Sequence, residues 1–497
     1  MSITRIIVKY FTDHNSEMSA VDLLMEMDQI DQLKNYASKD NYKKVYDYLV
    51  ASSHYSADHG DYTKILEVAY DVAMKFDDFS NGLRVSIKLD DDDKIRNSFE
   101  SCKDPVYQKQ LAFALGRQRI ILECENEELV DIFSNSKLSE FYIKLATELN
   151  VLAPKKPQEV LKTQIDDSNP SGKIDSAKLN LADTYVNAFV NVGTGQDALM
   201  QGGAKDPWIH SVKDTGIMAA TASLGLIYLW DFHGCSSAIS DYLDMKDGYA
   251  KAGALLGIGI SNSGTWSELD PAKAILEDSL ESPELSVKKG AIIGLGLAYA
   301  GTAREEFLET ISPHLNDTAN DNTIGVNSAL SLALIHVGKC NEEVVNSILS
   351  SMMERTTEQL NESISKMYGI ALGLCFLGRQ SLCENALETL KSIEHPIARF
   401  SEVILEACAY IGSGNVLKIQ QFLQKCTTHE EPENSLPQSA AVMGIALLAI
   451  SEEVGNEMAV RAMHHIMQYC ELHVKRAIPI ALGTFFLTNK NSLAFYQ

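Results

Sequence analysis

Two nearly identical glycine-rich phrases constrain the fold of this chain more than any other feature. They read GALLGIGISNSG at residues 253–264 and GAIIGLGLAYAG at residues 290–301, so corresponding glycines lie 37 residues apart. A fixed period of this length, without proline inside either phrase, is typical of an array of helical repeats. The sequence therefore predicts an all-α protein whose repeats stack on one another.

The first phrase also predicts how neighbouring repeats pack. On a helix that turns about 100° per residue, Gly253, Gly257 and Gly264 fall on one bare stripe, and Leu255 and Ile258 lie elsewhere on the circumference. A helix that is apolar nearly all round is buried on all sides. Each glycine inside a helix costs roughly 1 kcal/mol relative to alanine. We expect close approach of neighbouring helices at the bare stripe to offset that cost.

The repeat continues to the end of the chain. The residues that close successive small-residue phrases recur every 34 to 40 positions, and they are Trp230, Gly264, Gly301, Gly338, Gly378, Gly412, Ser451 and Thr488. Amphipathic stretches between the phrases, such as 270–280 and 343–355, predict outer helices that alternate with the inner, small-residue helices. We therefore expect an α-solenoid of helix pairs over residues 211–497.

Residues 1–165 predict a helical section that lacks the glycine phrase. Residues 19–37 have apolar positions close to a helical stripe and predict one helix with Ser19 as its N-cap. Similar stretches at 42–55 and 62–76 predict a pair of helices.

A linker is expected between the two sections. Residues 151–173 concentrate proline, serine, glycine and charge, a composition that favours a loop. The apolar pattern that follows it, at 176–200, predicts a helix leading into the array. We therefore assign residues 166–210 to linker and lead-in helix.

The charge balance excludes some classes of partner. The chain has 497 residues, 67 acidic and 43 basic, for a net charge of −24. Nucleic-acid binding depends on lysines and arginines that neutralise phosphates, so this composition favours basic or mixed-charge protein surfaces as partners. The longest apolar runs are about half a membrane span, and no signal peptide is evident. The sequence predicts a soluble intracellular protein without nucleic-acid or membrane partners.

The nine cysteines are scattered, odd in number and without a C-x-x-C pair. Several of them, such as Cys375, stand in apolar helical phrases. They therefore predict buried free thiols in a reducing compartment.

No active site is evident in the sequence. The glycine phrases have the wrong spacing for a dinucleotide fingerprint, and neither a P-loop nor an H-E-x-x-H motif occurs. The aspartates at 90–93 favour a helix start or a loop over a metal site, since no alternating ligand pattern follows. His464, His465, Cys470 and His473 are ligand-type residues, but no acidic or cysteine pair completes a zinc set. We expect no catalysis, metal or cofactor; an enzyme that uses a metal at 464–473 is the alternative.

Longer phrases resemble a known family. ASLGLIYLW, KAGALLGIGISNSG, KKGAIIGLGLAYAGTAREE, EACAYIGSGNVLKIQQFL and KRAIPIALG are similar to proteasome/cyclosome repeats. They are most similar to the larger repeat-containing scaffolds of the 26S proteasome regulatory particle base, the non-ATPase subunit 2 family. The likeness extends upstream through DLLMEMDQID, SCKDPVYQKQLAFALGRQ and DSAKLNLADTYVNAFVN. The sister non-ATPase subunit 1 resembles the chain only in the glycine phrases.

This resemblance implies a fold and a function. The fold is a toroidal α-solenoid, preceded here by the helical N-terminal section. The implied function is non-catalytic: docking on the coiled coil of two ATPase subunits, contact with other base subunits, and binding of ubiquitin chains, ubiquitin-like domains of shuttle factors and a deubiquitinase. The implied location is the cytoplasm and nucleus. The sister subunit and a solenoid adaptor unrelated to proteasomes are the alternatives.

The resemblance also implies two binding sites. The family's main site uses acidic residues on the outer helix after a V-G-x-C-N phrase, which is VGKCN at 337–341 here. Glu343 and Glu354 stand at acidic positions of that pattern, and Ser350 stands at a third, often acidic, position. Met352 or Met353 is expected to add apolar contact; ordinary solvated helix acids are the alternative.

The second implied site, used by a deubiquitinase's ubiquitin-like domain, is the helix turn at 229–238, where His233 replaces a common aspartate. Family members also carry further N-terminal residues, further repeats and a C-terminal domain. We therefore expect an incomplete toroid, from a truncated or a reduced subunit.

Overall fold

The computed structural model describes residues 3–53, 55–56, 58–160, 176–197, 199–200, 208–267, 269–317, 321–428, 436–450 and 456–486. Every regular element among them is a helix, which confirms the all-α class. The chain divides into two compact units, Met1–Asn135 and Ser136–Gln497. The expected boundaries near residues 165 and 210 stay predictions, because 161–175 and 201–207 lie outside the described residues.

The first unit is a succession of short helices around two apolar cores. Its α-helices are α1 (Ile3–Asp13), α2 (Glu17–Glu26), α3 (Tyr42–Ser53), α4 (His59–Lys75), α5 (Phe79–Leu89), α6 (Asp92–Glu100), α7 (Pro105–Arg117) and α8 (Glu127–Phe133), with a 3-10 helix, η1 (Ile30–Asn35), after α2. The expected helix pair at 42–55 and 62–76 is confirmed as α3 and α4. The aspartate run starts a helix, since Asp91 caps α6 by accepting a hydrogen bond from the Lys94 amide.

The single helix expected over residues 19–37 is wrong. Helix α2 begins two residues earlier than Ser19 and ends at Glu26, because Asp28 adopts a left-handed conformation with φ 49° and breaks the helix. Ser16 occupies the N-cap position, and Ser19 lies in the first turn with its hydroxyl 3.1 Å from that of Ser16. The apolar stripe is shared between α2 and η1.

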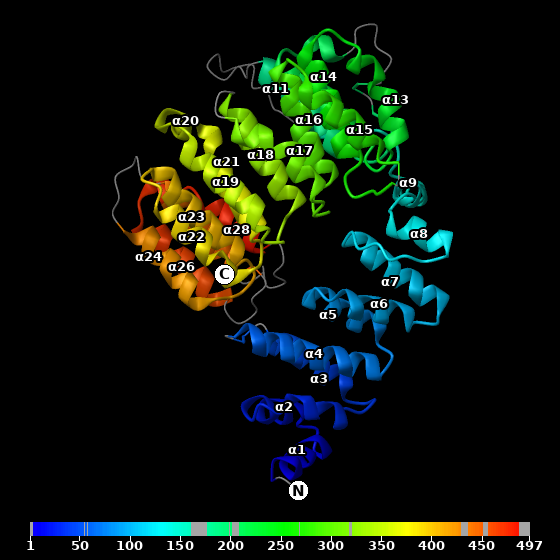
Figure 1. The fold of residues 1–497 in the computed structure, drawn as a ribbon, viewed down its shortest axis with the longest axis vertical. Coiled ribbons are helices and arrows are strands. Elements are labelled where there is room, and N and C mark those ends of the chain that lie inside the picture. The colour runs from blue at the N-terminus through cyan, green and yellow to red at the C-terminus, as the bar shows by residue number, and fades with distance from the viewer. Residues whose placement is uncertain are drawn as a thin grey trace. The chain divides into compact units, whose positions relative to one another are not determined.

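The second unit contains the repeat array (Figure 1). Its inner helices are α11 (Ser176–Val190), α12 (Thr215–Ile227), α14 (Gly248–Ser261), α16 (Leu285–Ala298), α18 (Asn322–Ile335), α21 (Met367–Cys375), α23 (Pro396–Ala409), α25 (Leu436–Leu448) and α28 (Ile478–Phe486). Each packs against the next in the series. Helices α9 (Leu138–Glu148) and α10 (Pro157–Val160) precede the array.

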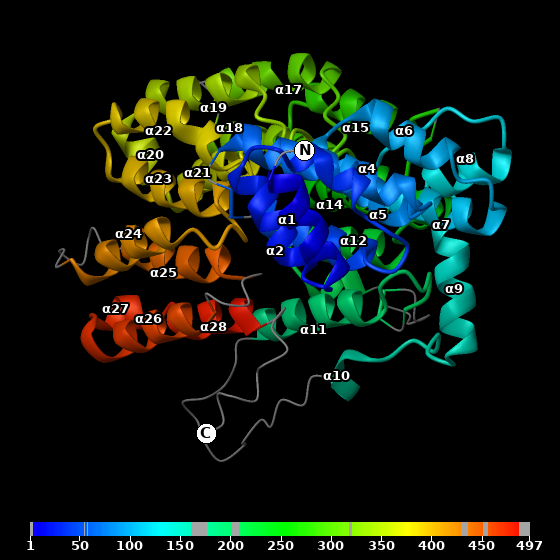
Figure 2. The same ribbon diagram turned by 90° about the horizontal axis from the view of Figure 1, so that it is seen from below.

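Outer helices alternate with the inner ones, as expected. They are α13 (Phe232–Leu243), α15 (Pro271–Asp278), α17 (Glu306–Asn316), α19 (Glu342–Glu354), α22 (Glu384–Lys391), α24 (Val416–Thr427) and α26 (Asn456–Tyr469). Short elements connect some pairs: η3 (Trp208–Ser211), η4 (Ser279–Glu281), α20 (Thr357–Asn361), η5 (Ser363–Lys366), η6 (Gln380–Cys383) and α27 (Leu472–Lys475). Figure 2 shows α15, α17, α19 and α22 along one side, with α12, α14, α18 and α21 beneath them.

Glycines let the inner helices touch through their backbones. A Cβ atom at Gly259 would lie 2.3 Å from the carbonyl oxygen of Gly294, and one at Gly225 would lie 2.3 Å from that of Gly257. The close approach expected at the bare stripe is confirmed at Gly257, which meets Gly225, and at Gly253, where a Cβ atom would lie 2.3 Å from the carbonyl oxygen of Met218. One member of the expected stripe is misplaced, because α14 ends at Ser261 and Gly264 lies in the following turn with φ 85°.

The closing residues form a chain of hydrogen bonds from repeat to repeat. Each has a left-handed conformation wherever it is described, which glycine adopts without a steric penalty. Five closing amides donate to a carbonyl at the C-terminal end of the next inner helix: Trp230 to Ser261 (3.0 Å), Gly301 to Leu334 (2.8 Å), Gly338 to Leu374 (2.9 Å), Gly378 to Cys408 (3.0 Å) and Gly412 to Leu447 (2.9 Å). These bonds satisfy carbonyls that a helix end would otherwise leave without a donor.

The same kind of hydrogen bond also occurs one repeat before Trp230, the first closing residue expected from the sequence. Gly193, in the turn after α11, donates its amide to Leu226 of α12 at 3.0 Å, and Gly195 donates to Ile227 at 3.0 Å. The lead-in helix expected from the sequence is thus the first inner helix. The last two predicted closing residues, Ser451 and Thr488, lie outside the described residues.

Candidate functional site

The helix that follows the VGKCN phrase is α19, and Asn341, the last residue of that phrase, caps its first turn. The side chain of Asn341 accepts hydrogen bonds from the amides of Glu343 (3.0 Å) and Val344 (3.3 Å). An asparagine at this position satisfies amides that have no partner within the helix. Glu342 and Glu343 stand in the first turn, where negative charge is favoured by the helix dipole.

One face of α19 fixes the helix to the array. Val344, Ile348 and Met352 are fully buried. The hydroxyl of Ser351 donates to the carbonyl of Leu315, at the C-terminal end of α17, at 3.1 Å. Met352 is therefore a core residue and cannot contact a partner, which leaves Met353 of the two expected methionines.

The opposite face carries the predicted site residues. Glu343, Ser350 and Glu354 are all exposed. At about 100° per residue they lie within roughly 40° of one another around the helix axis, and at 1.5 Å per residue they span about 16 Å along it. Met353 borders this stripe with 49% of its surface exposed. We call Glu343, Ser350, Met353 and Glu354 the α19 face.

A buried arginine holds the C-terminal end of α19. Arg355 has only 4% of its surface exposed. Its Nη2 atom donates to the carbonyls of Leu315 (3.1 Å) and Asp317 (3.2 Å) at the end of α17, where a cation is favoured by the helix dipole. Its Nε and Nη1 atoms have no hydrogen-bond partner among the described residues. Sequence reasoning missed this residue, because an arginine next to an acidic helix end resembles a surface charge.

The second predicted site is the turn between α12 and α13. Asp231 caps α13 by accepting a hydrogen bond from the Gly234 amide at 2.9 Å, and His233 is exposed beside it. Trp230 has φ 67°, and its ring lies edge-on to Tyr142 of α9 at 5.8 Å between centroids. The tryptophan side chain explains why this closing position is not glycine.

The residues at 464–473 do not converge on one point. His465 lies against the ring of Tyr469 at 4.8 Å, and His473 contacts the side chains of Gln438 (2.8 Å) and Glu471 (3.4 Å). Cys470 is buried. Within the described part of the chain, no group of three potential metal ligands is found.

The thiols are free in the structure, and most are buried. Burial raises the pKa of Cys375 to about 12 and that of Cys235 to about 11. Thiols of this kind are poor nucleophiles at neutral pH, since the thiolate is the reactive form. Among the described helices, none has the length and apolar character needed to cross a membrane.

Two family models match the chain. The model described as "RPN1 N-terminal domain" matches residues 1–166, and the model described as "Proteasome/cyclosome repeat" matches residues 290–324. The second range contains the GAIIGLGLAYAG phrase, most of α16, all of α17 and the first residues of α18.

Curated relatives match nearly the whole chain. The 26S proteasome regulatory subunit rpn1 of Schizosaccharomyces pombe is 38% identical over 504 residues, which cover 100% of this chain and 56% of the relative. The 26S proteasome non-ATPase regulatory subunit 2 homolog A of Arabidopsis thaliana is 37% identical over 98% of this chain and 57% of the relative. The 26S proteasome non-ATPase regulatory subunit 2 of Dictyostelium discoideum is 38% identical over 97% of this chain and 54% of the relative.

The chain is a homologue of this proteasome regulatory subunit. The resemblance seen in the sequence phrases is therefore confirmed, since the relatives reported above are rpn1 and subunit 2 proteins. The chain spans a little over half the length of these relatives.

Proposed function

We propose that this chain is a non-catalytic scaffold in the base of the 26S proteasome regulatory particle. In this role it takes part in ubiquitin-dependent protein degradation and binds ubiquitin-carrying partners near the ATPase ring. The names of its relatives, which describe regulatory and non-ATPase subunits, support the assignment. A stacked array also suits the role, because each outer helix can bind a partner while the inner helices hold the array together.

The α19 face is the proposed docking site for ubiquitin chains and for ubiquitin-like domains of shuttle factors and a deubiquitinase. Glu343 and Glu354 supply negative charge on either side of Ser350, and Met353 supplies apolar surface. The recognition face of ubiquitin is apolar with a basic rim, so the two surfaces are complementary. The cap at Asn341 and the buried Arg355 fix both ends of α19 before a partner arrives, which limits the ordering cost of binding.

A titration tests this site. We expect Glu343→Arg combined with Glu354→Arg to weaken binding of a recombinant shuttle-factor ubiquitin-like domain at least tenfold, or about 1.4 kcal/mol. The matched control is Glu384→Arg with Glu388→Arg on α22, which changes net charge equally on another exposed outer helix. Equal affinity in the two double variants would show that the α19 face is not the site.

Affinity purification tests the scaffold role separately. The tagged chain, expressed in its own cells, should be recovered with the six ATPases and the sister scaffold when the eluate is examined by mass spectrometry. Recovery with transport machinery instead, or alone, would contradict the scaffold assignment whatever α19 binds.

A further inference from the structure

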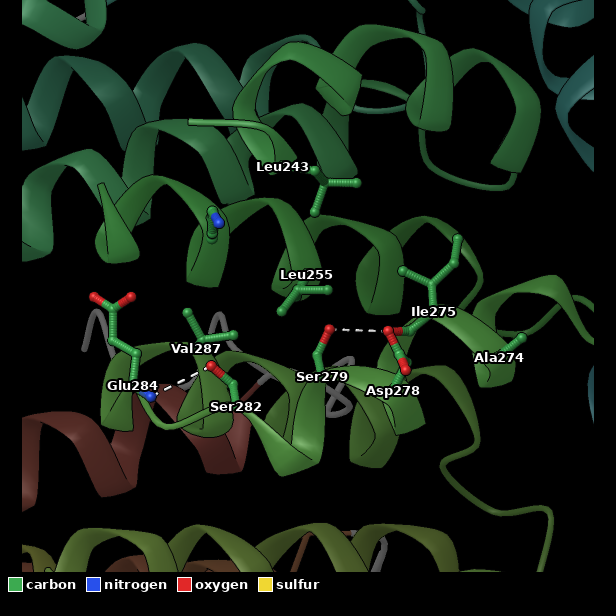
Figure 3. Close-up of a pocket in the computed structure, with 10 residues that line it drawn as sticks. Leu243, Leu255, Ala274, Ile275, Asp278, Ser279, Ser282, Glu284 and Val287 are labelled. Carbon is green, nitrogen blue, oxygen red and sulfur yellow. Dashed lines mark hydrogen bonds between the residues drawn. The ribbon is translucent and has the colours of Figure 1, made fainter. Parts of the chain in front are cut away.

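A groove of about 660 Å³ opens between the outer helices α13 and α15. Leu243 from the end of α13, Leu255 of α14, Ile275 of α15 and Val287 of α16 line its apolar part. Figure 3 shows these four side chains around one hollow, with Glu284 at one end and Ala274 at the other. The groove lies two repeats before α19, so it is separate from the α19 face.

The groove lies where α15 ends and the chain passes through η4 to α16. Helix α15 has 8 residues, whereas α13 has 12 and α17 has 11. Helix α15 begins at Pro271, with Asp270 at its N-cap position, and at Ser279 the chain changes to a 3-10 turn. Leu255 and Val287, from the inner helices α14 and α16, line the floor of this hollow although little of their surface is exposed.

The rim of the groove is acidic. The two segments that bound it, 241–251 and 274–287, together carry seven acidic residues and two lysines. Asp278 and Glu284 line the groove itself, opposite a single lysine, Lys251. The carboxylate of Glu284 lies against Gly248 at the start of α14, where a Cβ atom would overlap it, and it accepts a hydrogen bond from the Ser286 hydroxyl at 3.2 Å. Glu284 is therefore held at the end of the groove.

We propose that this groove binds a linear segment of a partner protein in which apolar side chains are flanked by lysine or arginine. The apolar side chains enter between Leu243, Leu255 and Ile275, and the flanking cations pair with Asp278 and Glu284. A volume of this size is in the range of specific ligand sites and suits a few residues of an extended chain. The proposal goes beyond the scaffold assignment, since the α19 face is a convex helix surface suited to a folded domain.

Fluorescence anisotropy with synthetic peptides tests the proposal on the full chain. The probe is a labelled peptide of about ten residues in which leucines alternate with lysines and arginines. We expect saturable binding with one site per chain. A probe with serine in place of every leucine should bind at least tenfold more weakly, and a probe with glutamate in place of every cation should not bind.

Two variants locate the site. Ala274→Trp fills the groove without changing its charge, and Asp278→Lys with Glu284→Lys inverts the charge of the rim. Each change should weaken binding of the leucine probe at least tenfold. Glu384→Lys with Glu388→Lys on α22 is the charge-matched control and should leave the affinity within twofold. Circular dichroism checks that each variant keeps its helices.

Three outcomes of the peptide titrations would overturn the proposal, and a competition experiment supplies a fourth. The leucine probe fails to saturate, or the serine probe binds equally well, or the α22 control loses as much affinity as the rim variant. The last two would mean that the peptide responds only to the net charge of the protein. A ubiquitin-like domain that displaces the probe while Ala274→Trp has no effect would also contradict a linear-segment site.

Discussion

The inner and outer helices of the array are limited by different constraints. In the inner helices α14 and α16, backbone meets backbone at Gly259 and Gly294, so even one methyl group does not fit. In the outer helix α19, only the face that holds Val344 and Ile348 is buried. The inner helices therefore determine whether the array forms, whereas substitutions on the exposed faces of the outer helices can alter binding without preventing folding.

The largest expected effect comes from adding a methyl group to an inner contact. Gly259→Ala forces α14 and α16 apart and should lower the free energy of unfolding by about 3 kcal/mol. Gly483→Ala in α28 is the matched control, because nothing lies within 4 Å of its Cβ position in the described structure, and it should stabilise slightly through helix propensity. Urea denaturation followed by circular dichroism measures both. Similar losses of unfolding free energy in the two variants would show that close backbone contact between the inner helices does not limit stability.

The next effect concerns the buried contact between two outer helices. Arg355→Ala removes the donor from the carbonyls of Leu315 and Asp317 and leaves a cavity, so it should cost about 2 kcal/mol. Glu354→Ala, at the exposed position next to it, should change stability by less than about 0.5 kcal/mol. The same denaturation experiment checks both variants, and an unaffected Arg355→Ala would mean that α17 and α19 pack without this contact.

A third effect depends on pH. Burial raises the pKa of Glu406 on the inner helix α23, but hydrogen bonds and charge from Lys418 and Lys425 of α24 outweigh burial, and the pKa lies below its usual value. The contacts are 2.9 and 3.3 Å. A depressed carboxyl pKa stabilises the folded state above the pKa of the unfolded chain, and this stabilisation is lost as pH falls through the folded-state pKa.

Glu406→Gln should therefore cost about 2 kcal/mol at pH 7. The difference from the parent protein should shrink as pH falls below about 4.5, the ordinary glutamate value. Thermal unfolding monitored at a series of pH values measures this difference. A difference that stays constant across the acid range would show that the pair with α24 contributes no pH-dependent stability.

The smallest effect on stability is expected at the proposed docking site. Glu343→Arg with Glu354→Arg changes only exposed residues and should alter the free energy of unfolding by about 0.5 kcal/mol or less. This is the variant in which a large loss of binding is expected. A substantial loss of stability would mean that the α19 face belongs to the structural part of the molecule.

The repeat pattern was sufficient to predict the inner helices, because backbone contact requires glycine and glycine is visible in sequence. It was insufficient where a tertiary contact replaces the glycine. Trp230 closes its repeat in a left-handed conformation with its ring against Tyr142, and Gly264 belongs to a turn and not to the helix stripe. The break at Asp28 was missed because the apolar stripe continues through it.

The candidate site was only partly predictable. Sequence placed Glu343, Ser350 and Glu354 on an outer helix, and the structure places all three on its exposed face. It did not separate Met352 from Met353, since their burial depends on the angle at which α19 meets its neighbours. Neither Arg355 nor the groove beside α15 follows from a local pattern, because each depends on where separate helices end.

Hydrogen–deuterium exchange on the full chain, with and without a saturating ubiquitin-like domain, tests the central claim most directly. We expect the inner helices to be the most protected segments in both states and added protection to appear at residues 342–356. Added protection elsewhere, with α19 unchanged, would contradict the assignment of docking to the α19 face. Inner helices that exchange as fast as the outer ones would contradict the division between a structural and a binding layer.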